Sequence, residues 1–335
     1  MQSPIFDRSS KTDSKETRYS LEVQANSSNP LVTVVIYTFN QEDLISRCLE
    51  GVLSQEPLSN LRILIIDDAS TDQTIKVCES FQDRFPEKIE IAALPENELS
   101  KGVFVGLTHI QNIKSEYIAF CDGDDYWIEN SKIKNQILAF EENENVGLVH
   151  SDYYQLFEHS DNFEIKQRPI FDIEKSARFQ GGLDLVKGNH IKNSTMMIRT
   201  NLIDFDFLSN SKGIYVNDWL LCVTVTRNHK VSYIPLKTTV IRINQNGIWN
   251  GSSSERNIGQ KMRVRWYCAS HLPSSKLRDA FIRRVMIDWI KSQISNSRPY
   301  KLVRPLILEI RKTKKPFVSF FRKISIFIYA TKKNR

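Results

Sequence analysis

Apolar residues in the first half of the chain form short unbroken runs that alternate with segments of helical periodicity. The runs 31–36 (LVTVVI) and 61–66 (LRILII) predict strands that are buried on both faces of a sheet. Between them, apolar residues spaced at i, i+4 and i+8 predict a helix over 41–55, with Asn40 as its N-cap.

The same alternation continues to about residue 150. We expect helices at 72–85, 101–113 and 131–142, and strands at 89–94, 117–121 and 146–150. This order predicts an α/β fold with a mostly parallel central sheet and helices on both faces. In such sheets, ligands bind beyond the carboxyl ends of the strands.

The second half of the chain is less regular. The pattern predicts a strand at 194–199, a helix at 218–226, short strands at 231–234 and 238–243, a mobile loop at 244–254 and a helical segment at 258–294. We therefore expect a disordered leader at 1–30, an α/β domain at 31–255 and a helical, basic C-terminal extension at 256–335.

Composition bears on where the protein works. The leader is rich in Ser, Asn, Lys and Glu and lacks the apolar core of a signal peptide, so we expect a cytoplasmic protein. The five cysteines are scattered along the chain, which argues against a metal knuckle and suits a reducing compartment.

The net charge of +7 is concentrated in the tail, because residues 301–335 contain 11 Lys and Arg against one acid. The remainder of the chain is therefore mildly acidic. Within the tail, the 14-residue apolar and aromatic stretch 317–330 is too short to span a bilayer. Its basic flanks predict an interfacial helix on an anionic membrane, such as the inner face of the plasma membrane, and the alternative is a helix packed on the core. We expect no nucleic-acid binding, because no base-binding motif accompanies the basic residues.

Acidic residues gather where three elements begin or end. Asp67 and Asp68 close the second strand, the run Asp122-Gly123-Asp124-Asp125 closes the fourth, and Asp218 opens a helix. Carboxylates crowded on one turn repel one another unless a cation is present, and Mg²⁺ or Mn²⁺ commonly bridges carboxylate and diphosphate. Gly123 lets the backbone bend so that Asp122 and Asp124 converge. For any single aspartate, a plain turn or cap is the alternative.

Three segments with the order and spacing of a known family carry these residues. They are 32–40 (VTVVIYTFN), 65–72 (IIDDASTD) and 116–127 (EYIAFCDGDDYW). The chain resembles the inverting family 2 glycosyltransferases, which have the GT-A fold. The resemblance implies transfer of one sugar from a nucleotide-diphosphate donor, with uridine as the expected base, to the hydroxyl of a saccharide or lipid-linked acceptor.

The resemblance also implies roles for individual residues. Thr38, Phe39 and Asn40 lie on the loop where the family places the nucleotide base, and Asp68 resembles the carboxylate that reads the base or ribose. Asp122 and Asp124 resemble the DxD pair, with Asp124 as the more direct ligand of Mn²⁺ or Mg²⁺. Asp218 resembles the catalytic base, and the alternative for it is a helix N-cap.

Other positions are less determined. The Ala-Arg-Asn-type run of many members is absent, and Lys101 at the start of a helix would serve the diphosphate instead, unless it is an ordinary surface lysine. His190, Trp219 and Trp249 are candidate acceptor contacts, with Trp249 on the mobile loop. The QxxRW signature of processive members is missing, which favours addition of a single sugar.

Two other functions remain open. A metal-dependent phosphotransferase or phosphatase would also use an Asp-Gly-Asp turn, although usually after its first strand. A non-catalytic sugar-nucleotide-binding protein would keep the fold and lose the chemistry. A dinucleotide-dependent oxidoreductase is disfavoured, because no Gly-x-Gly-x-x-Gly follows the first strand.

Overall fold

The structure is a computed structural model that describes residues 30–56, 61–159, 162–167, 181–243 and 254–294. The chain divides into two units, residues 1–252 and 253–335, close to the predicted boundary between residues 255 and 256. The predicted leader (apart from Pro30), Trp249 with its loop, and the basic tail lie outside the described residues.

Within the described part of the first unit, nine strands form one sheet, in the order β3-β2-β1-β4-β8-β6-β9-β5, with β7 paired to β6. The strands are β1 (Val32–Thr38), β2 (Leu61–Asp67), β3 (Ile89–Ala93), β4 (Tyr117–Asp122), β5 (Tyr126–Trp127), β6 (Val146–His159), β7 (Asn162–Gln167), β8 (Met196–Arg199) and β9 (Lys230–Ile243). Strands β3, β2, β1 and β4 are parallel, and β8 is an antiparallel insert between β4 and β6. Because β9 runs parallel to β6, six strands share one direction, which confirms the mostly parallel sheet.

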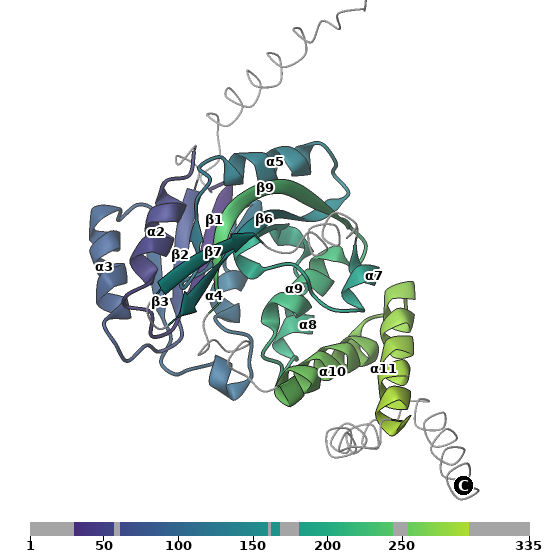
Figure 1. Ribbon diagram of the computed structural model, residues 1–335. Coiled ribbons are helices and arrows are strands. Elements are labelled where there is room, and N and C mark those ends of the chain that lie inside the picture. The colour runs from purple at the N-terminus through teal and green to yellow at the C-terminus, as the bar shows by residue number, and fades with distance from the viewer. Residues whose placement is uncertain (1–29, 57–60, 160–161, 168–180, 244–253, 295–335) are drawn as a thin grey trace, which may run out of the picture. The chain divides into compact units, whose positions relative to one another are not determined.

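Helices cover both faces of this sheet (Figure 1). In the first unit they are α2 (Ile45–Leu53), α3 (Thr74–Arg84), α4 (Leu107–Gln111), α5 (Lys132–Glu141), α7 (Gly182–Leu185), α8 (Phe205–Ser209) and α9 (Asn217–Thr226). Helices α2, α3 and α5 share one apolar core with β1 and with Met197 of β8. Neighbouring strand residues point to opposite faces, so the contact of Cys222 with Met196 places α9 on the other face.

The predicted helix over 101–113 is wrong. The structure has a 3₁₀ turn at Leu99–Lys101 and a short α4 instead. Gly102 and Gly106 between them have φ angles of 67° and 61°, in the left-handed region that interrupts a right-handed helix. A Cβ on Gly102 would lie 2.8 Å from the Cα of Gly213, so this loop also depends on close backbone approach.

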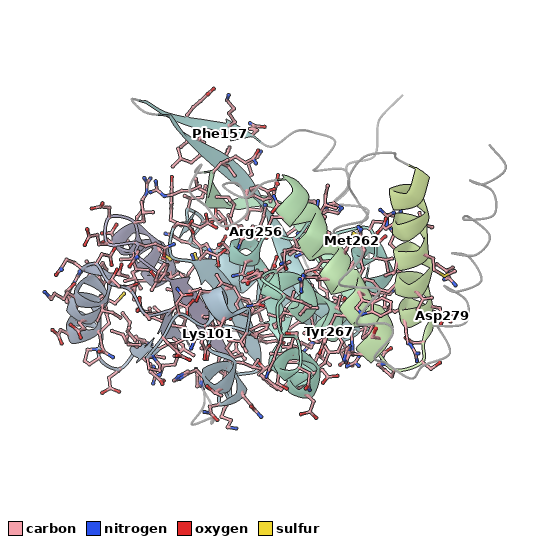
Figure 2. All side chains as sticks on the ribbon, turned by 90° about the horizontal axis from the view of Figure 1, so that it is seen from below. Lys101, Phe157, Arg256, Met262, Tyr267 and Asp279 are labelled. Carbon is pink, nitrogen blue, oxygen red and sulfur yellow. The ribbon has the colours of Figure 1, made fainter. Side chains whose placement is uncertain are left out.

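The two short strands predicted at 231–234 and 238–243 are one continuous strand, β9. Its pairing with β6 shifts register between Ser151 and Asp152, opposite Ile234 and Lys237, so Pro235 falls in a bulge where no ladder hydrogen bond is required. Strand β6 is also longer than predicted and continues into a hairpin with β7. Figure 2 shows the hairpin, with Phe157, extending away from the body of this unit.

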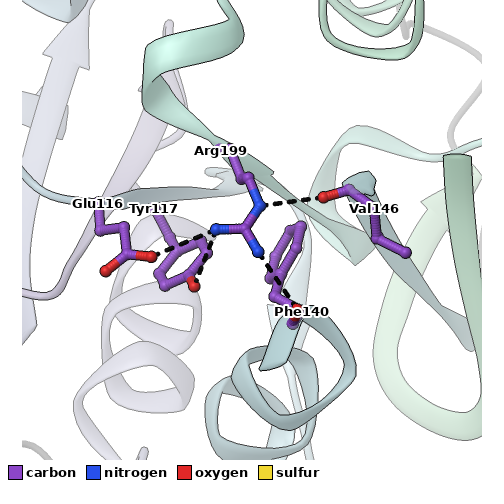
Figure 3. Close-up of polar contacts among 5 residues, drawn as sticks. All are labelled: Glu116, Tyr117, Phe140, Val146 and Arg199. Atoms are coloured by element: carbon purple, nitrogen blue, oxygen red, sulfur yellow. Dashed lines mark hydrogen bonds and ion pairs between the residues drawn. The ribbon is translucent and has the colours of Figure 1, made fainter. Parts of the chain in front are cut away.

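Arg199, the last residue of β8, binds the amino end of β4 to its surroundings (Figure 3). Its guanidinium donates to the carbonyl oxygens of Val146 and Phe140 at 3.0 and 3.2 Å. It also donates to the Glu116 carboxylate and the Tyr117 hydroxyl, both at 3.3 Å. One side chain therefore joins β4, α5 and β6 at the edge of the sheet opposite the predicted site.

In the second unit, the predicted helical segment 258–294 is two helices, α10 (Ser254–His271) and α11 (Lys276–Ile294). Arg265 of α10 is 2.7 Å from Asp288 of α11, which also pairs with Arg284. Across the described ranges, none of the helices has the length and apolar character needed to cross a membrane.

Candidate functional site

Three parallel strands end at one edge of the sheet and bring the acidic residues together. Thr38 pairs with Asp67, and Tyr37 pairs with Asp122, so the carboxyl ends of β1, β2 and β4 are level. The backbone N–H of Asp68 donates to the Thr38 carbonyl at 2.9 Å, and that of Gly123 donates to the Tyr37 carbonyl at 2.8 Å. The sequence prediction of a site at this edge therefore has a clear geometric basis.

The loop after β1 is tied to the loop after β2 by its own side chains. Asn40 accepts from the Thr71 N–H at 2.8 Å, and the Asn40 N–H donates to the Ser70 hydroxyl at 2.8 Å. Asn40 is therefore not a helix N-cap, because α2 begins only at Ile45, with Leu44 in the cap position. Next to it, Phe39 is 42% exposed and available to a ligand.

Thr38 and Asp68 are both buried at the inner end of these loops. The Thr38 hydroxyl donates to Gln41 at 2.8 Å. Asp68 accepts from the backbone N–H groups of Glu98 and Leu99 at 2.6 and 3.1 Å, which fixes the following turn against β2. Burial raises the pKa of Asp68, against the opposing effect of these two donors. Their contacts with a nucleotide remain predictions.

Lys101 occupies a different local structure from the one predicted. It ends a 3₁₀ turn and does not open a helix, so no helix amino terminus supports an anion beside it. Its ammonium pairs with Glu96, and the Lys101 side chain is 51% exposed. The diphosphate role would therefore require Lys101 to exchange partners.

The acidic turn after β4 is held by residues far away in sequence. The Asp122 carboxylate accepts from the Asn193 amide at 2.6 Å, and the Asp122 N–H donates to the Ser194 hydroxyl at 2.9 Å. That hydroxyl donates to Asp125 at 2.6 Å, and the Arg242 N–H donates to the other Asp125 oxygen at 2.9 Å. Both oxygens of buried Asp125 therefore anchor the turn on which Asp122 and Asp124 lie.

Gly123 is required by crowding. A Cβ at this position would lie 2.3 Å from the Gln41 side-chain oxygen, 3.0 Å from Ile45 and 3.1 Å from Thr38. The backbone does turn here, with the Asp125 N–H donating to the Asp122 carbonyl at 2.9 Å, but the φ of Gly123 is not among the positive values of the described residues. The glycine instead lets the acidic turn lie directly against the loop after β1.

The electrostatics of the turn are unfavourable without a cation. Burial raises the pKa of Asp122 to about 7, and the charge of Asp124 adds to this effect. Burial and the charges of Asp124 and Asp122 likewise raise the pKa of Asp125 well above its ordinary value. A bound cation would remove this repulsion.

The donor set fits a metal held jointly with a ligand. Among the described residues, no group of three or more His, Cys, Asp or Glu side chains could hold a metal ion. Asp122 and Asp124 would therefore supply two ligands, and diphosphate oxygens would supply others, which is a common arrangement for Mg²⁺ and Mn²⁺.

Asp218 lies in the first turn of α9, beside the acidic turn. It is not the helix N-cap, because that position is Val216. The Asn189 amide donates to the Asp218 carboxylate at 2.8 Å. Burial raises the pKa of Asp218, while the Trp219 backbone N–H, the Lys192 charge and Asn189 oppose the rise. The charge of Asp218 in turn raises the pKa of Asp122, so the two carboxylates share one site.

The candidate acceptor residues behave differently from one another. Trp219 is 2% exposed, and its indole N–H donates to the Leu185 carbonyl at 3.1 Å, so it packs α9 against α7 and makes no acceptor contact. His190 is half-buried beside Asn189, and its role remains a prediction. Trp249 lies outside the described residues.

Sequence reasoning expected an acceptor contact in this region, at His190, but did not predict that the segment contacts the acidic groups. Asn189, Lys192, Asn193 and Ser194 all act on Asp122, Asp125 or Asp218. The sequence signals were the neighbouring candidate His190 and a position at the start of a predicted strand. A cleft of about 570 Å³, lined by residues that include Gln111, Asp204, Arg227 and His229, contains none of the predicted site residues.

Comparison with known proteins agrees with this geometry. Residues 33–198 match the family model described as Glycosyl transferase family 2. Over 124 residues, the chain is 36% identical to the Escherichia coli UDP-Glc:alpha-D-GlcNAc-diphosphoundecaprenol beta-1,3-glucosyltransferase WfaP, covering 37% of this chain and 46% of that protein. The chain covers 35% to 62% of the length of the first five curated relatives that it matches.

Two solved structures share the fold. TarS residues 1–349 from S. aureus, in complex with UDP-GlcNAc, gives a TM-score of 0.58 at 15% identity, over 81% of this chain and 77% of that one. The mannosyltransferase PcManGT from Pyrobaculum calidifontis, in complex with GDP-Man and Mn²⁺, gives a TM-score of 0.55 at 13% identity, over 93% of this chain and 86% of that one.

Proposed function

The chain belongs to glycosyl transferase family 2 through residues 33–198, and from this membership we propose that it is an inverting, single-addition glycosyltransferase. The observation that carries the proposal is that one short segment hydrogen-bonds both Asp218, through Asn189, and Asp122, through Asn193, and that the charge of Asp218 raises the pKa of Asp122. A base candidate and a diphosphate site must be this close for one displacement at the anomeric carbon.

The donor side is formed by the loops after β1, β2 and β4. Phe39 is exposed for contact with the base, and Asp68 lies behind it at the end of β2. Asp122 and Asp124 would hold Mn²⁺ or Mg²⁺, which when bound supplies positive charge for the departing diphosphate. Lys192 supplies positive charge close to this turn, because its ammonium lowers the pKa of Asp122.

Asp218 acts as the base in this proposal. It takes the proton of the acceptor hydroxyl as that oxygen bonds to the anomeric carbon, and the bond from this carbon to the diphosphate breaks with its electron pair on the diphosphate. Attack from the face opposite the leaving group inverts the configuration. The hydrogen bond from Asn189 favours the charged form of Asp218 that this step requires.

We further propose a UDP-linked donor and a lipid-linked saccharide acceptor. The similarity to WfaP, which is named for UDP-Glc, and to TarS, which was solved with UDP-GlcNAc, supports this choice, whereas GDP-Man in PcManGT gives the alternative donor. The basic tail 301–335 would hold the enzyme on the anionic inner face of the membrane, where such acceptors are presented.

The test is thermal stabilisation by UDP, GDP and their sugars, with and without Mn²⁺. Ligands that bind only the native state raise its melting temperature by mass action. We expect a UDP-dependent rise that requires metal, disappears in Asp124→Ala and persists in Asp83→Ala, a change at an exposed carboxylate of α3. No shift with any nucleotide would contradict the proposal and favour the phosphotransferase alternative.

A further inference from the structure

One short segment contacts three of the acidic residues of the site, Asp122, Asp125 and Asp218. Residues 189–194, which we call the strap, connect α7 to the 3₁₀ turn Asn193–Thr195 before β8. Asn189 donates to Asp218 at 2.8 Å, and Asn193 donates to Asp122 at 2.6 Å. Ser194 donates to the anchor of the acidic turn, Asp125, at 2.6 Å. Side chains of one short segment therefore contact both the base candidate Asp218 and the carboxylates of the acidic turn, Asp122 and Asp125.

The orientation of the Asn189 amide is determined by its second hydrogen bond. Its Oδ1 accepts from the backbone N–H of Ile191 at 3.0 Å. An amide has one acceptor end and one donor end, so this bond leaves the Nδ2 group to face Asp218. The strap therefore presents a donor, and never an acceptor, to the carboxylate.

Buried groups beneath the strap hold its backbone in place. The Ser194 carbonyl accepts from the indole N–H of Trp127 at 2.8 Å. The Thr195 carbonyl accepts from the buried Gln136 amide at 2.9 Å, and the Thr195 N–H donates to the Lys192 carbonyl at 3.0 Å. A segment anchored on β5 and α5 in this way can set the distance between two functional groups.

We infer that the strap fixes Asp218 relative to the donor-side carboxylates, with Asn189 as the positioning residue for the base and Asn193 as the positioning residue for Asp122. The inference rests on the proposed function, because that function assigns the role of base to Asp218. Neither asparagine is given a chemical step, and each acts only through the carboxylate that it contacts.

Asn189→Asp separates positioning from local folding. The variant carboxylate keeps an oxygen for the Ile191 N–H and turns an acceptor toward Asp218. Asn143→Asp is the matched control, because Asn143 accepts from the Asn145 N–H at 3.0 Å with the same two-residue spacing, on an exposed loop. Asn189→Ala provides a second variant if the aspartate does not fold.

We expect Asn189→Asp to lower kcat by about 10- to 100-fold and to leave the KM for the UDP-sugar unchanged. Asn143→Asp should match the unmodified protein. A purely structural role for Asn189 predicts that both variants keep full kcat, and this result would overturn the inference. Asn193→Asp should instead weaken the affinity for UDP with Mn²⁺, measured by calorimetry, by about 10-fold. An unchanged affinity would show that Asn193 does not position Asp122.

A double-mutant cycle tests the contact without any assay of transfer. Asn189→Asp should raise the unfolding equilibrium constant by about 10-fold in the unmodified protein and far less in an Asp218→Asn background. Equal effects in both backgrounds would show that Asn189 does not hold Asp218. If the unmodified protein binds no nucleotide and transfers no sugar, the proposed function is wrong, and the cycle still decides whether the strap holds this carboxylate.

Discussion

The two ends of strand β4 differ in how their charged groups are paired. At the amino end, the Arg199 guanidinium meets a carboxylate, a hydroxyl and two carbonyl oxygens within 3.3 Å (Figure 3). At the carboxyl end, Asp122, Asp124 and Asp125 crowd together, and burial with like charge raises the pKa of Asp122 to about 7. The first arrangement stabilises the fold, whereas the second costs stability that a bound proton or a cationic ligand would relieve.

The largest effect at the carboxyl end of β4 is expected on turnover, from Asp218→Asn. Removing the base should lower kcat by about 10³-fold, because general-base catalysis contributes on this scale. Binding of UDP with Mn²⁺ should be unchanged, since Asn189 can pair with the new amide oxygen as it does with the carboxylate. Steady-state kinetics and calorimetry check both parts, and near-normal turnover would reassign the base.

At the opposite end, Arg199→Met should lower the free energy of unfolding by about 3 kcal/mol and leave UDP affinity unchanged. The change strands the carbonyl oxygens of Val146 and Phe140 that Arg199 satisfies. Lys166→Met is the control, because its pair with Glu164 is about half exposed. Urea denaturation measures both, and equal small losses would contradict the structural role of Arg199.

Lys132 lies between the two ends, fully buried on α5, with its ammonium 2.7 Å from Gln136 and 4.3 Å from the Trp127 ring. Burial lowers its pKa to about 7, so the folded state binds this proton more weakly than the unfolded chain. Stability should therefore rise as pH increases from about 7 to about 10. Lys132→Met should add about 2 kcal/mol at pH 6 and much less at pH 10.

The control for that measurement is Lys134→Met on the same helix, where the side chain is only half-buried. Its effect on the free energy of unfolding should be small and independent of pH. A gain for Lys132→Met that is the same at pH 6 and pH 10 would show that Lys132 has the same pKa in the folded and unfolded states and stays charged in both.

The smallest effect is expected from Asp122→Asn in metal-free protein. Because burial and Asp124 raise the pKa of Asp122, the folded state binds its proton more tightly than the unfolded chain, and stability falls as pH rises toward about 7. The amide should add about 1 kcal/mol at pH 8 and little near pH 4. Denaturation in the presence of a chelator checks this, with exposed Asp83→Asn as the control.

The local pattern of apolar residues was sufficient to predict the bounds of elements that bury a continuous run or stripe of such residues. Strands β1 and β2 and helices α3 and α9 fall within two residues of their expected bounds, because each has an apolar run or stripe that faces the core. The edge where Asp68 and Asp122 meet followed from parallel topology, and the family resemblance carried Asp218 to the same place.

The remaining features depend on partners distant in sequence. Asn189 and Asn193 gain meaning from carboxylates 29 and 71 residues away, and no local signal separates them from other loop asparagines. Strand β6 was underestimated because Ser151 and Asp152 are polar, although both are buried in its pairing with β9. Trp219 was misassigned because proximity in sequence to Asp218 says nothing about which way a helical side chain points.

The hydrogen bond from Arg242 to Asp125 also has a consequence for the order of events during folding. It closes a loop of 117 residues, whereas the bonds that join the first two loops span only about 30. Contacts of such long range generally form late, because their closure entropy is the largest. A newly made chain should therefore complete the loops after β1 and β2 well before the acidic turn, so the proposed metal site should be among the last parts of the fold to form.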